Sequence, residues 1–418
     1  MSESTTCAVI GGGPAGMVLG LLLARAGVEV TVLEKHGDFL RDFRGDTVHP
    51  TTLQLLDELG LGQRFAELPY SRMTEVAFPV DEQHSVVVGD LSRLRVRHPY
   101  IAIAPQWDFL NLLADAGEKE PTFTLRMRTE VTELIRETDR VRGVRYRTED
   151  GEEGELRADL VVACDGRWSL ARQQAGLRPK ELPVPIDAWW FRLPRKPDED
   201  PGRLMPRMRG TRLAVTIPRT GYFQIAYIAK KGTDAELRAR GIEDFRRQIG
   251  EVLPQLADRT GELKSMDDVK HLDVRLNRLY RWHVDGLVCL GDAAHAMSPI
   301  GGVGINLAVQ DAVAAATLLA RPLLRGDVTT TTLAKVRRRR LLPTILVQAL
   351  QQLLHRVIAK PVVEGTRTGP PKPLIALMRR VPQASFVPAY LIGVGLRPEH
   401  APDFARRPAL DNPARRER

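Results

Sequence analysis

A glycine-rich segment between two short apolar runs constrains the fold of this chain more than any other feature. Gly11, Gly13 and Gly16 follow the pattern G-x-G-x-x-G directly after the apolar run 8–10. In a strand–loop–helix unit, the first glycine permits a tight turn and the second lets a pyrophosphate approach the backbone. The third lets the helix pack closely on the strand. The pattern predicts a Rossmann-like α/β unit that binds a dinucleotide.

The residues after the glycine segment complete this unit. Pro14 and Ala15 begin a helical stretch, and the apolar run 28–33 forms a second strand that ends at Glu34. In such units an acidic residue about 20 positions after the glycines binds a ribose hydroxyl. The helix start offers free N–H groups and a positive dipole end to phosphates. We therefore predict that the helix start, Glu34 and the adjacent Lys35 contact the cofactor.

Two later apolar runs also end in an aspartate next to a glycine. One run precedes Asp165 and Gly166, and the other precedes Gly291 and Asp292. Ligands of open α/β sheets bind at the carboxyl ends of the strands. We therefore expect both aspartates to lie at the same edge of the sheet as the glycine segment.

The three motifs, in this order, resemble those of the group A flavin monooxygenases, the para-hydroxybenzoate hydroxylase family. The resemblance implies an FAD-binding fold in which the first motif binds the ADP part of FAD. It also implies that Asp165 and Arg172 serve FAD binding and NAD(P)H use, and that Asp292 binds the ribityl chain.

Two further segments extend this resemblance, which covers about residues 5–330. Residues 44–57 resemble the segment that supplies an arginine to FAD, here Arg44. Residues 105–110 resemble the strand-to-helix stretch that supplies a glutamine, here Gln106. No histidine or cysteine occupies a recognisable attachment position, so FAD is expected to be bound noncovalently.

A glycine-rich loop follows the third motif and runs into a helical stretch at 305–319. A helix start presents backbone N–H groups that lack partners within the helix. Because reduced flavin carries negative charge on its pyrimidine side, such a helix start would stabilise that anion and favour flavin reduction. The residues expected to position or contact the flavin are Pro299, Gly301, Gly302, Val303, Gly304, Ile305 and Asn306.

The sequence divides into parts that differ in their predicted secondary structure. We predict an α/β fold with an inserted sheet and C-terminal helices. The expected parts are a discontinuous FAD-binding domain (1–75, 100–180 and 275–335), a substrate-binding β-sheet domain (76–99 and 181–274), and a C-terminal helical segment with a basic tail (336–418). The inserted sheet is expected to contain strands at 189–193, 212–217 and 222–227. Residues 76–88 are expected to add a strand to the same sheet.

Aromatic side chains are concentrated in the strands of the inserted sheet, which forms the floor and walls of the substrate pocket in the resembled family. The candidate substrate contacts are Trp189, Phe191, Tyr222 and Gln224. Gln224 lies in an otherwise apolar run and should share a face of its strand with Tyr222. This mixture favours an aromatic or polyketide-like small molecule as the substrate.

The charge pattern limits the other classes of partner. The net charge is +9, with four consecutive arginines at 337–340 and a basic tail at 415–418. We interpret these residues as a solvated helix face and a loose tail, and no nucleic-acid partner is expected. Neither the nine histidines nor the three cysteines show metal-ligand spacing, so no metal site is predicted.

Cysteine usage and hydropathy address the cellular location. Cys7, Cys164 and Cys289 lie in or next to predicted buried strands, which indicates no disulfide framework and fits a reducing cytoplasm. The apolar stretch 8–24 lacks the basic flank of a signal peptide. No other run reaches the length of a membrane span. We expect a cytoplasmic protein without a membrane span, either a monomer or a homodimer.

The resemblance implies an FAD-dependent monooxygenase that uses NADPH or NADH and O2. In this family a C4a-hydroperoxide of the flavin transfers one oxygen atom to an electron-rich substrate, which is hydroxylated or epoxidised. The cofactor carries the chemistry, and the protein supplies orientation, polarity and water exclusion. We therefore assign no catalytic side chain from the sequence.

Three alternatives stay open at this point. A flavin-dependent halogenase shares the FAD fold, and residues 189–194 are a degenerate form of the W-x-W-x-I-P motif of such enzymes. However, no lysine lies between Lys35 and Lys119, where their essential lysine is expected. An isoprenoid reductase of the geranylgeranyl type would use reduced flavin without inserting oxygen. The third alternative is a non-catalytic FAD-binding protein.

Overall fold

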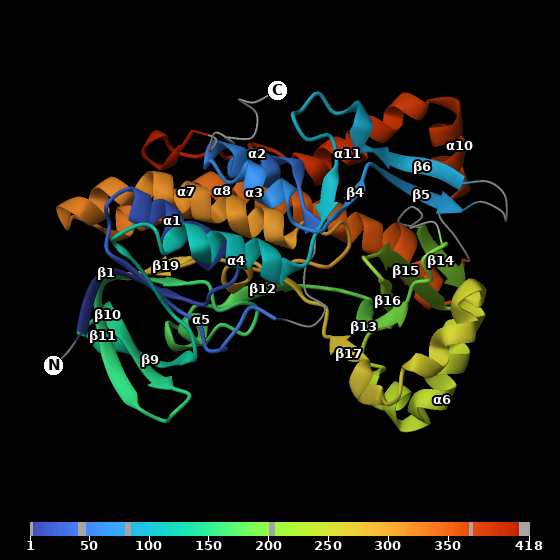
Figure 1. Ribbon diagram of the computed structural model, residues 1–418, viewed down its shortest axis with the longest axis horizontal. Coiled ribbons are helices and arrows are strands. Elements are labelled where there is room, and N and C mark those ends of the chain that lie inside the picture. Colours follow the sequence, from blue (N-terminus) through green and yellow to red (C-terminus); the bar gives the residue numbers. More distant parts are fainter. Residues whose placement is uncertain (1–2, 41–46, 80–84, 200–204, 368–370, 409–418) are drawn as a thin grey trace, which may run out of the picture.

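The computed structural model describes residues 3–40, 47–79, 85–199, 205–367 and 371–408 of the chain. Figure 1 shows a larger sheet that contains the N-terminal strand, a smaller sheet on the opposite side of the molecule, and long helices that lie across the larger sheet. This arrangement confirms the predicted α/β fold class. The boundaries that we assigned to the domains stay a prediction.

The larger sheet is built around parallel strands whose carboxyl ends lie in register. Its strands are β1 (Glu3–Ile10), β2 (Val30–Leu33), β8 (Phe123–Arg126), β9 (Thr129–Glu137), β10 (Arg140–Thr148), β11 (Glu153–Ala163), β19 (His283–Val284) and β20 (Leu287–Cys289). The order is β19-β20-β11-β1-β2-β8, and β9 and β10 extend β11 as an antiparallel hairpin. Ile10 pairs with Leu33 and with Ala163, which itself pairs with Cys289. The loops after these four strands therefore leave the sheet at one edge.

Four helices cover this sheet: α1 (Pro14–Arg25), α4 (Gln106–Gly117), α7 (Gly304–Arg325) and α8 (Thr330–Leu354). Buried residues of these helices form one core with β1 and β2. Among the described residues, α7 alone is long and apolar enough to cross a membrane, but 72% of its apolar window is buried inside the protein. Its apolar character is thus explained by packing. The expectation that no run other than residues 8–24 reaches the length of a membrane span is therefore wrong for α7.

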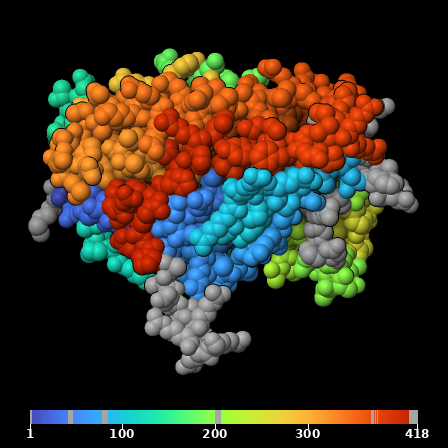
Figure 2. Space-filling view, turned by 90° about the horizontal axis from the view of Figure 1, so that it is seen from above, coloured from blue at the N-terminus to red at the C-terminus, as the bar shows by residue number. Residues whose placement is uncertain are grey.

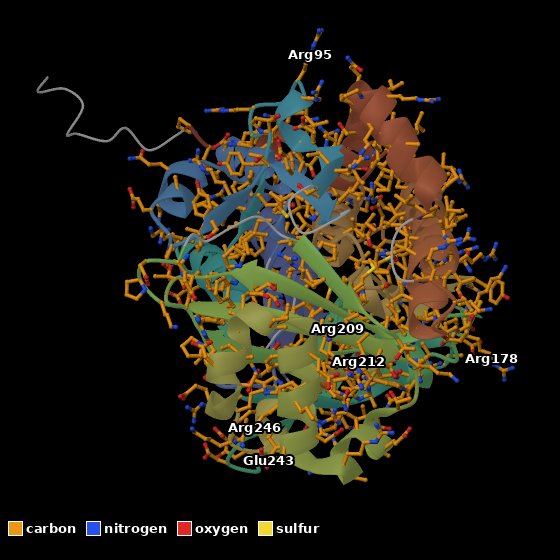
Figure 3. The ribbon with its side chains drawn as sticks, turned by 90° about the vertical axis from the view of Figure 1, so that its right-hand side faces the viewer. Arg95, Arg178, Arg209, Arg212, Glu243 and Arg246 are labelled. Atoms are coloured by element: carbon orange, nitrogen blue, oxygen red, sulfur yellow. The ribbon has the colours of Figure 1, made fainter. Side chains whose placement is uncertain are left out.

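The smaller sheet is antiparallel, with the order β14-β15-β16-β13-β17. Its strands are β13 (Ile186–Pro194), β14 (Met205–Arg209), β15 (Arg212–Pro218), β16 (Tyr222–Lys230) and β17 (Lys270–Leu272). The three predicted strands are therefore confirmed. One face packs on α6 (Asp234–Val252). Figure 3 shows Arg209 and Arg212 where the sheet meets this helix, and both donate hydrogen bonds of 2.8 Å to Glu251.

The described residues between 76 and 88 do not pair with the smaller sheet. β5 (Glu75–Pro79) and β6 (Ser85–Asp90) pair only with each other among the described residues. β6 lies against α10 (Lys372–Arg380) and α11 (Phe386–Gly393), whereas β5 lies beside β14, the edge strand of the smaller sheet. The expectation of a strand added to the same sheet was therefore wrong for the described residues, because β5 lies next to that sheet without pairing with it.

Short elements connect these layers. A small sheet with the order β3-β7-β4 lies beside two helices near the top of Figure 1. These elements are β3 (Thr47–Val48), α2 (Pro50–Glu58), α3 (Gly62–Ala66), β4 (Ser71–Met73) and β7 (Ile101–Ile103). Elsewhere the chain forms the short helix α5 (Leu170–Gln174), and β12 (Pro179–Leu182) pairs with β18 (Leu276–Leu279). Short 3₁₀ turns lie at 91–93, 254–262, 266–268, 291–293, 382–385 and 403–405.

The C-terminal segment closes one face of the molecule. After α8 the chain makes a π-helical turn (His355–Ala359), followed by α9 (Lys360–Val363), α10 and α11. Figure 2 shows this segment, in red, between the α7–α8 pair and the β5–β6 hairpin. Among the described residues, helices extend from Thr330, before the predicted boundary at 336, to Gly393.

A buried group of charges fastens the third motif to this C-terminal segment. The carboxylate of Asp311 on α7 lies 2.5 Å from His295 Nε2 and 3.0 Å from Arg340 Nε, and it accepts a hydrogen bond of 3.2 Å from the Gly291 N–H. Arg340 in turn lies 3.5 Å from Glu399. Burial alone would raise the pKa of Asp311, but His295 and Arg340 outweigh burial and lower that pKa. Asp311 therefore stays ionised inside the protein.

Arg340→Met should destabilise the fold by about 3 kcal/mol, because the buried Asp311 loses its arginine partner and is left with His295, while Glu399 keeps Arg339. The free energy of unfolding, measured by urea denaturation at neutral pH, gives the loss. Arg338→Met is the matched control, since Arg338 is exposed on the same helix. The control should change stability by less than about 0.5 kcal/mol. Equal losses for the two variants would contradict a special role for the buried group.

Candidate functional site

The three sequence motifs meet at the carboxyl edge of the larger sheet. A Cβ atom built on Gly11 would lie 2.6 Å from the carbonyl oxygen of Cys164, at the start of the second motif. A Cβ atom on Gly291, in the third motif, would lie 3.5 Å from Ala15 Cβ. The first motif is therefore in contact with both of the others, as the sequence predicted.

The start of α1 forms an open cradle. Gly13 is the N-cap of the helix and Pro14 occupies its first turn. A backbone N–H at this position has no acceptor within the helix, so the N–H that proline lacks costs no hydrogen bond. A Cβ atom on Gly13 would meet nothing within 4 Å, whereas one on Gly16 would lie 2.0 Å from Gly11 O. Only glycine at position 16 lets the helix pack this closely on the strand. Because the first N–H groups of α1 border the open space, the cradle fits a pyrophosphate.

Glu34 follows β2 and lies against this cradle. Its side chain is buried, with 8% of the residue exposed. Oε2 accepts a hydrogen bond of 2.8 Å from the Gly12 N–H, and Oε1 accepts one of 3.1 Å from the His36 N–H. The carboxylate is thus held beside the glycine loop, which fits the predicted ribose contact. Lys35 is exposed next to it.

The second motif presents a carboxylate with an unused oxygen. Asp165 Oδ2 accepts a hydrogen bond of 3.1 Å from the Ala171 N–H. Its Oδ1 is buried and has no hydrogen-bond partner among the described residues. Burial raises the pKa of this carboxyl group. A Cβ atom on the neighbouring Gly166 would meet nothing within 4 Å. An orphaned acceptor beside open backbone is what a site for a hydroxyl-rich cofactor such as FAD requires.

Two arginines join the second motif to the third. Arg172 is buried and donates hydrogen bonds of 2.7 Å to the carbonyl of Arg167 and 3.3 Å to that of Ala293. Arg167 Nη2 lies 3.3 Å from the carboxylate of Asp292. In this structure Arg172 and Asp292 therefore serve to align the motifs, and their direct contact with FAD stays a prediction.

The loop at the start of α7, residues 298–304, is held on one side by a residue of β3 and by the residue that follows this strand. We call it the α7 loop. The Gly302 carbonyl accepts a hydrogen bond of 2.7 Å from Thr47 Oγ1 and lies 2.9 Å from His49 Nε2. His49 Nδ1 lies 2.9 Å from the carbonyl of Ile392 in α11. Burial lowers the pKa of His49 to about 4, against the opposing effect of its two carbonyl partners. His49 thus links the α7 loop to α11.

The other side of the α7 loop is held by α8 and the π-helical turn. Gln351 Nε2 donates hydrogen bonds of 2.8 Å to the carbonyls of Ser298 and Ile300, and its Oε1 accepts one of 3.2 Å from the Ser298 N–H. His355 Nε2 lies 2.9 Å from Ser298 Oγ. Burial lowers the pKa of His355 to about 4, so the ring is neutral near pH 7.

The first turn of α7 is anchored as well. Asn306 Oδ1 accepts hydrogen bonds of 2.8 Å from the hydroxyls of Thr51 and Thr52 in α2. Within the loop, the Gly302 N–H donates 3.0 Å to the Pro299 carbonyl and closes a turn. These anchors fix the direction of the first α7 N–H groups, which have no acceptor within the helix. The arrangement is suited to stabilising a negative charge in front of α7.

Sequence reasoning missed most of these anchors. Thr47 and His49 lie within the segment 44–57 but were not singled out there, and Gln351 and His355 belong to no motif. A glutamine such as Gln351 indicates an anchoring hydrogen bond only if its side chain is buried. The sequence does not show this until it is known which face of the helix packs in the core.

Of the two remaining predicted FAD contacts, Gln106 and Arg44, the structure places only Gln106. Gln106 is the first residue of α4 and is partly buried. It follows β7, whose Ile103 pairs with Thr47, so the segment of Gln106 lies next to the α7 loop anchors. Arg44 lies outside the described residues. Both contacts stay predictions.

Two of the four predicted substrate contacts lie on the wrong face of the smaller sheet. Trp189 and Phe191 are fully buried against α6. Trp189 Nε1 donates a hydrogen bond of 2.7 Å to Asp234, and the Phe191 ring packs edge-on to Phe245 with centroids 5.3 Å apart. These side chains form the core between sheet and helix. This placement corrects the expectation that they contact the substrate.

The opposite face of the smaller sheet carries Trp190, Tyr222 and Gln224. Trp190 packs in a cluster with Ile217 and Ile392, and its Nε1 is buried without a hydrogen-bond partner among the described residues. Gln224 is buried and accepts two hydrogen bonds, of 3.1 and 2.9 Å, from Arg219. Its amide is thus oriented from within the protein. Since the α7 loop packs on this same side of the sheet through Ile300, this face borders the candidate site.

Glu34→Ala should weaken FAD binding, because the predicted hydrogen bond from the ribose to a charged acceptor, worth about 1–3 kcal/mol, is lost. Titration of the apoprotein with FAD, followed by flavin fluorescence, measures the change in Kd. The matched control is Glu29→Ala, since Glu29 is exposed at the opposite end of the same strand segment. An unchanged FAD affinity in Glu34→Ala would count against a ribose contact.

Comparison with known proteins adds independent information. A family profile described as "FAD binding domain" matches residues 4–348. The 6-methylpretetramide 4-monooxygenase of Streptomyces rimosus is 34% identical over 341 residues, which are 80% of this chain and 80% of that protein. The family-profile match extends over all three motifs and the α7 loop.

Solved structures agree on the fold. The OxyS anhydrotetracycline hydroxylase from Streptomyces rimosus superposes with a TM-score of 0.74 at 24% identity, over 94% of this chain and 76% of that chain. The flavin-dependent brominase Bmp2 superposes with a TM-score of 0.75 at 16% identity, over 94% of both chains. At these identities the superpositions establish the fold alone. The family match over residues 4–348 and the 34% identical monooxygenase show that the chain belongs to the group A flavin monooxygenase family and is an FAD-dependent monooxygenase.

Proposed function

We propose that this enzyme uses NAD(P)H and O2 to hydroxylate or epoxidise an aromatic, polyketide-like small molecule in the cytoplasm. The observation that carries the proposal is the α7 loop. It is held from both sides, and it packs on the sheet face of Trp190. A relative at 34% identity, named for a 6-methylpretetramide substrate, supports the substrate class.

The residues at the sheet edge fit FAD, and each suits a different part of the cofactor. The cradle at Gly13 suits the pyrophosphate, Glu34 the ribose, and the orphaned oxygen of Asp165 a hydroxyl group. When bound, FAD supplies the acceptor of the hydride and the site of oxygen activation. The N–H groups at the start of α7 then stabilise negative charge in front of the helix without reorganising, because the α7 loop is already fixed.

The substrate side is apolar with few polar groups, as small-molecule sites are. Trp190 offers an unpaired N–H, and Gln224 offers an amide whose oxygen is already held by Arg219. A planar ring can lie against the apolar face while a hydroxyl or carbonyl oxygen accepts from one of these donors. The same enclosure excludes water, which limits loss of the activated oxygen as hydrogen peroxide.

The test of this proposal uses the FAD-loaded enzyme, tetracyclic and simpler phenols, and isotope-labelled O2. We expect a phenol to stimulate NADPH or NADH oxidation and the product to gain one labelled oxygen atom. Product formation without O2 would instead indicate a reductase. Halogenated product in the presence of bromide or chloride would indicate a halogenase. Either result, or no product from any compound, contradicts the proposal.

Trp190→Phe should raise the KM for the stimulating substrate about two- to tenfold, because the ring is kept and one hydrogen bond of about 0.5–1.5 kcal/mol is lost. FAD content should not change. Steady-state kinetics of NAD(P)H oxidation and hydrogen peroxide release provide the measurement. Trp189→Phe, on the opposite face, is the control and should leave KM unchanged. Equal KM values for Trp190→Phe and the unmodified enzyme would exclude this contact.

A further inference from the structure

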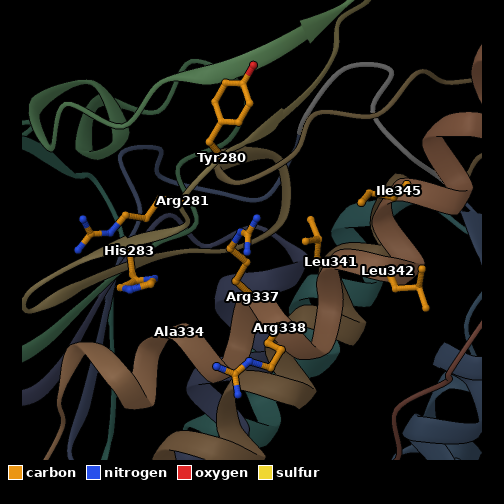
Figure 4. Close-up of a pocket in the computed structure, with 9 residues that line it drawn as sticks. All are labelled: Tyr280, Arg281, His283, Ala334, Arg337, Arg338, Leu341, Leu342 and Ile345. Carbon is orange, nitrogen blue, oxygen red and sulfur yellow. The ribbon is translucent and has the colours of Figure 1, made fainter.

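A cavity of about 380 Å³ lies away from the FAD site, between α8 and the segment that joins β18 to β19. Figure 4 shows its lining residues, which come from both elements. They are Tyr280, Arg281, His283, Ala334, Arg337, Arg338, Leu341, Leu342 and Ile345. β19 is the lateral edge strand of the larger sheet, whereas the motifs lie at the carboxyl ends of the parallel strands. The cavity is therefore a separate site.

The charge of this cavity is uncompensated. Three of its lining side chains are arginines, and none is an aspartate or glutamate. In the part of the chain that the structure describes, no carboxylate pairs with Arg281, Arg337 or Arg338, and Arg337 Nε is buried without a partner. By contrast Arg340, on another side of the same helix, has two buried carboxylates. Cations gathered without acids repel one another, so an anion placed among them would be stabilised.

A buried polar atom borders the same cavity. His283 is 8% exposed, and its Nδ1 is buried without a hydrogen-bond partner among the described residues. Burial and the nearby Arg281 and Arg337 lower the pKa of His283. Such orphaned groups are rare in folded proteins and point to a missing partner. The arginines and the histidine together offer several donors to one anionic group.

The remaining wall is apolar and open to solvent. Leu342 is 60% exposed and Tyr280 66% exposed, and Leu341 and Ile345 lie beside Leu342 on α8. Apolar side chains grouped at the rim of a polar cavity are typical of a site that binds the apolar part of a ligand. The volume is at the lower end of the range for small-molecule sites, roughly 300–1,000 Å³.

We infer that this cavity binds a small organic anion, whose phosphate or carboxylate group lies among Arg281, Arg337 and Arg338 and whose apolar body lies against Leu342 and Tyr280. A guanidinium group suits both anions, because its fork of donors matches two oxygens. The inference goes beyond the proposed monooxygenation and does not depend on it.

Isothermal titration calorimetry on the FAD-loaded enzyme tests the site with four probes: 1-naphthyl phosphate, 1-naphthoate, 1-naphthol and inorganic phosphate. We expect saturable binding of a naphthyl anion at a stoichiometry of one, and much weaker binding of neutral naphthol and of inorganic phosphate. The phosphate and carboxylate probes show which head group is preferred. No saturable binding of either naphthyl anion would overturn the inference.

Variants locate the site. Arg337→Gln and Arg338→Gln should each weaken binding of the naphthyl anion about tenfold, since a charge-assisted contact is lost. Leu342→Gln should weaken it as well. Arg325→Gln is the matched control, because Arg325 is exposed at the end of α7 and outside the cavity. Arg338 is also exposed, so its variant should fold normally; circular dichroism and FAD content check this. Equal affinities for Arg338→Gln and Arg325→Gln would place the binding elsewhere.

Discussion

The structure depends on one ionised carboxylate in its interior, that of Asp311. A buried charge is costly unless it is paired and hydrogen-bonded. Its three partners come from two places: the Gly291 N–H and His295 belong to the third motif, and Arg340 belongs to α8. Because all of them must converge, α7 is fixed against α8 and against the loop that leaves β20. The position of the α7 loop thus follows from an interaction outside the site itself.

Local signals were enough to predict the FAD part of the fold. The glycines of the first motif and the acid after β2 are adjacent to buried apolar runs, so strand, turn and helix are specified within a few residues. The parallel register then brings the ends of these strands together without further information. The two later Asp-Gly and Gly-Asp pairs could be placed at the same edge for this reason.

Contacts between distant segments could not be predicted in this way. Alternation along β13 shows that Trp189 and Trp190 point to opposite faces, but not which face is covered by α6. The anchors of the α7 loop pose the same difficulty. Thr47 and Gln351 donate to backbone carbonyls, which every residue possesses, so the sequence around their acceptors carries no matching signal. Such contacts are decided by the packing of whole helices.

The holding of the α7 loop from both sides has a consequence for synthesis. A chain grows from its N-terminus, and its early parts can fold while later ones are still being added. The cradle at Gly13 packs on α7, the α7 loop needs Gln351 and His355, and the buried charges need Glu399. The candidate site can therefore reach its final shape only after the C-terminal segment has been synthesised and has docked.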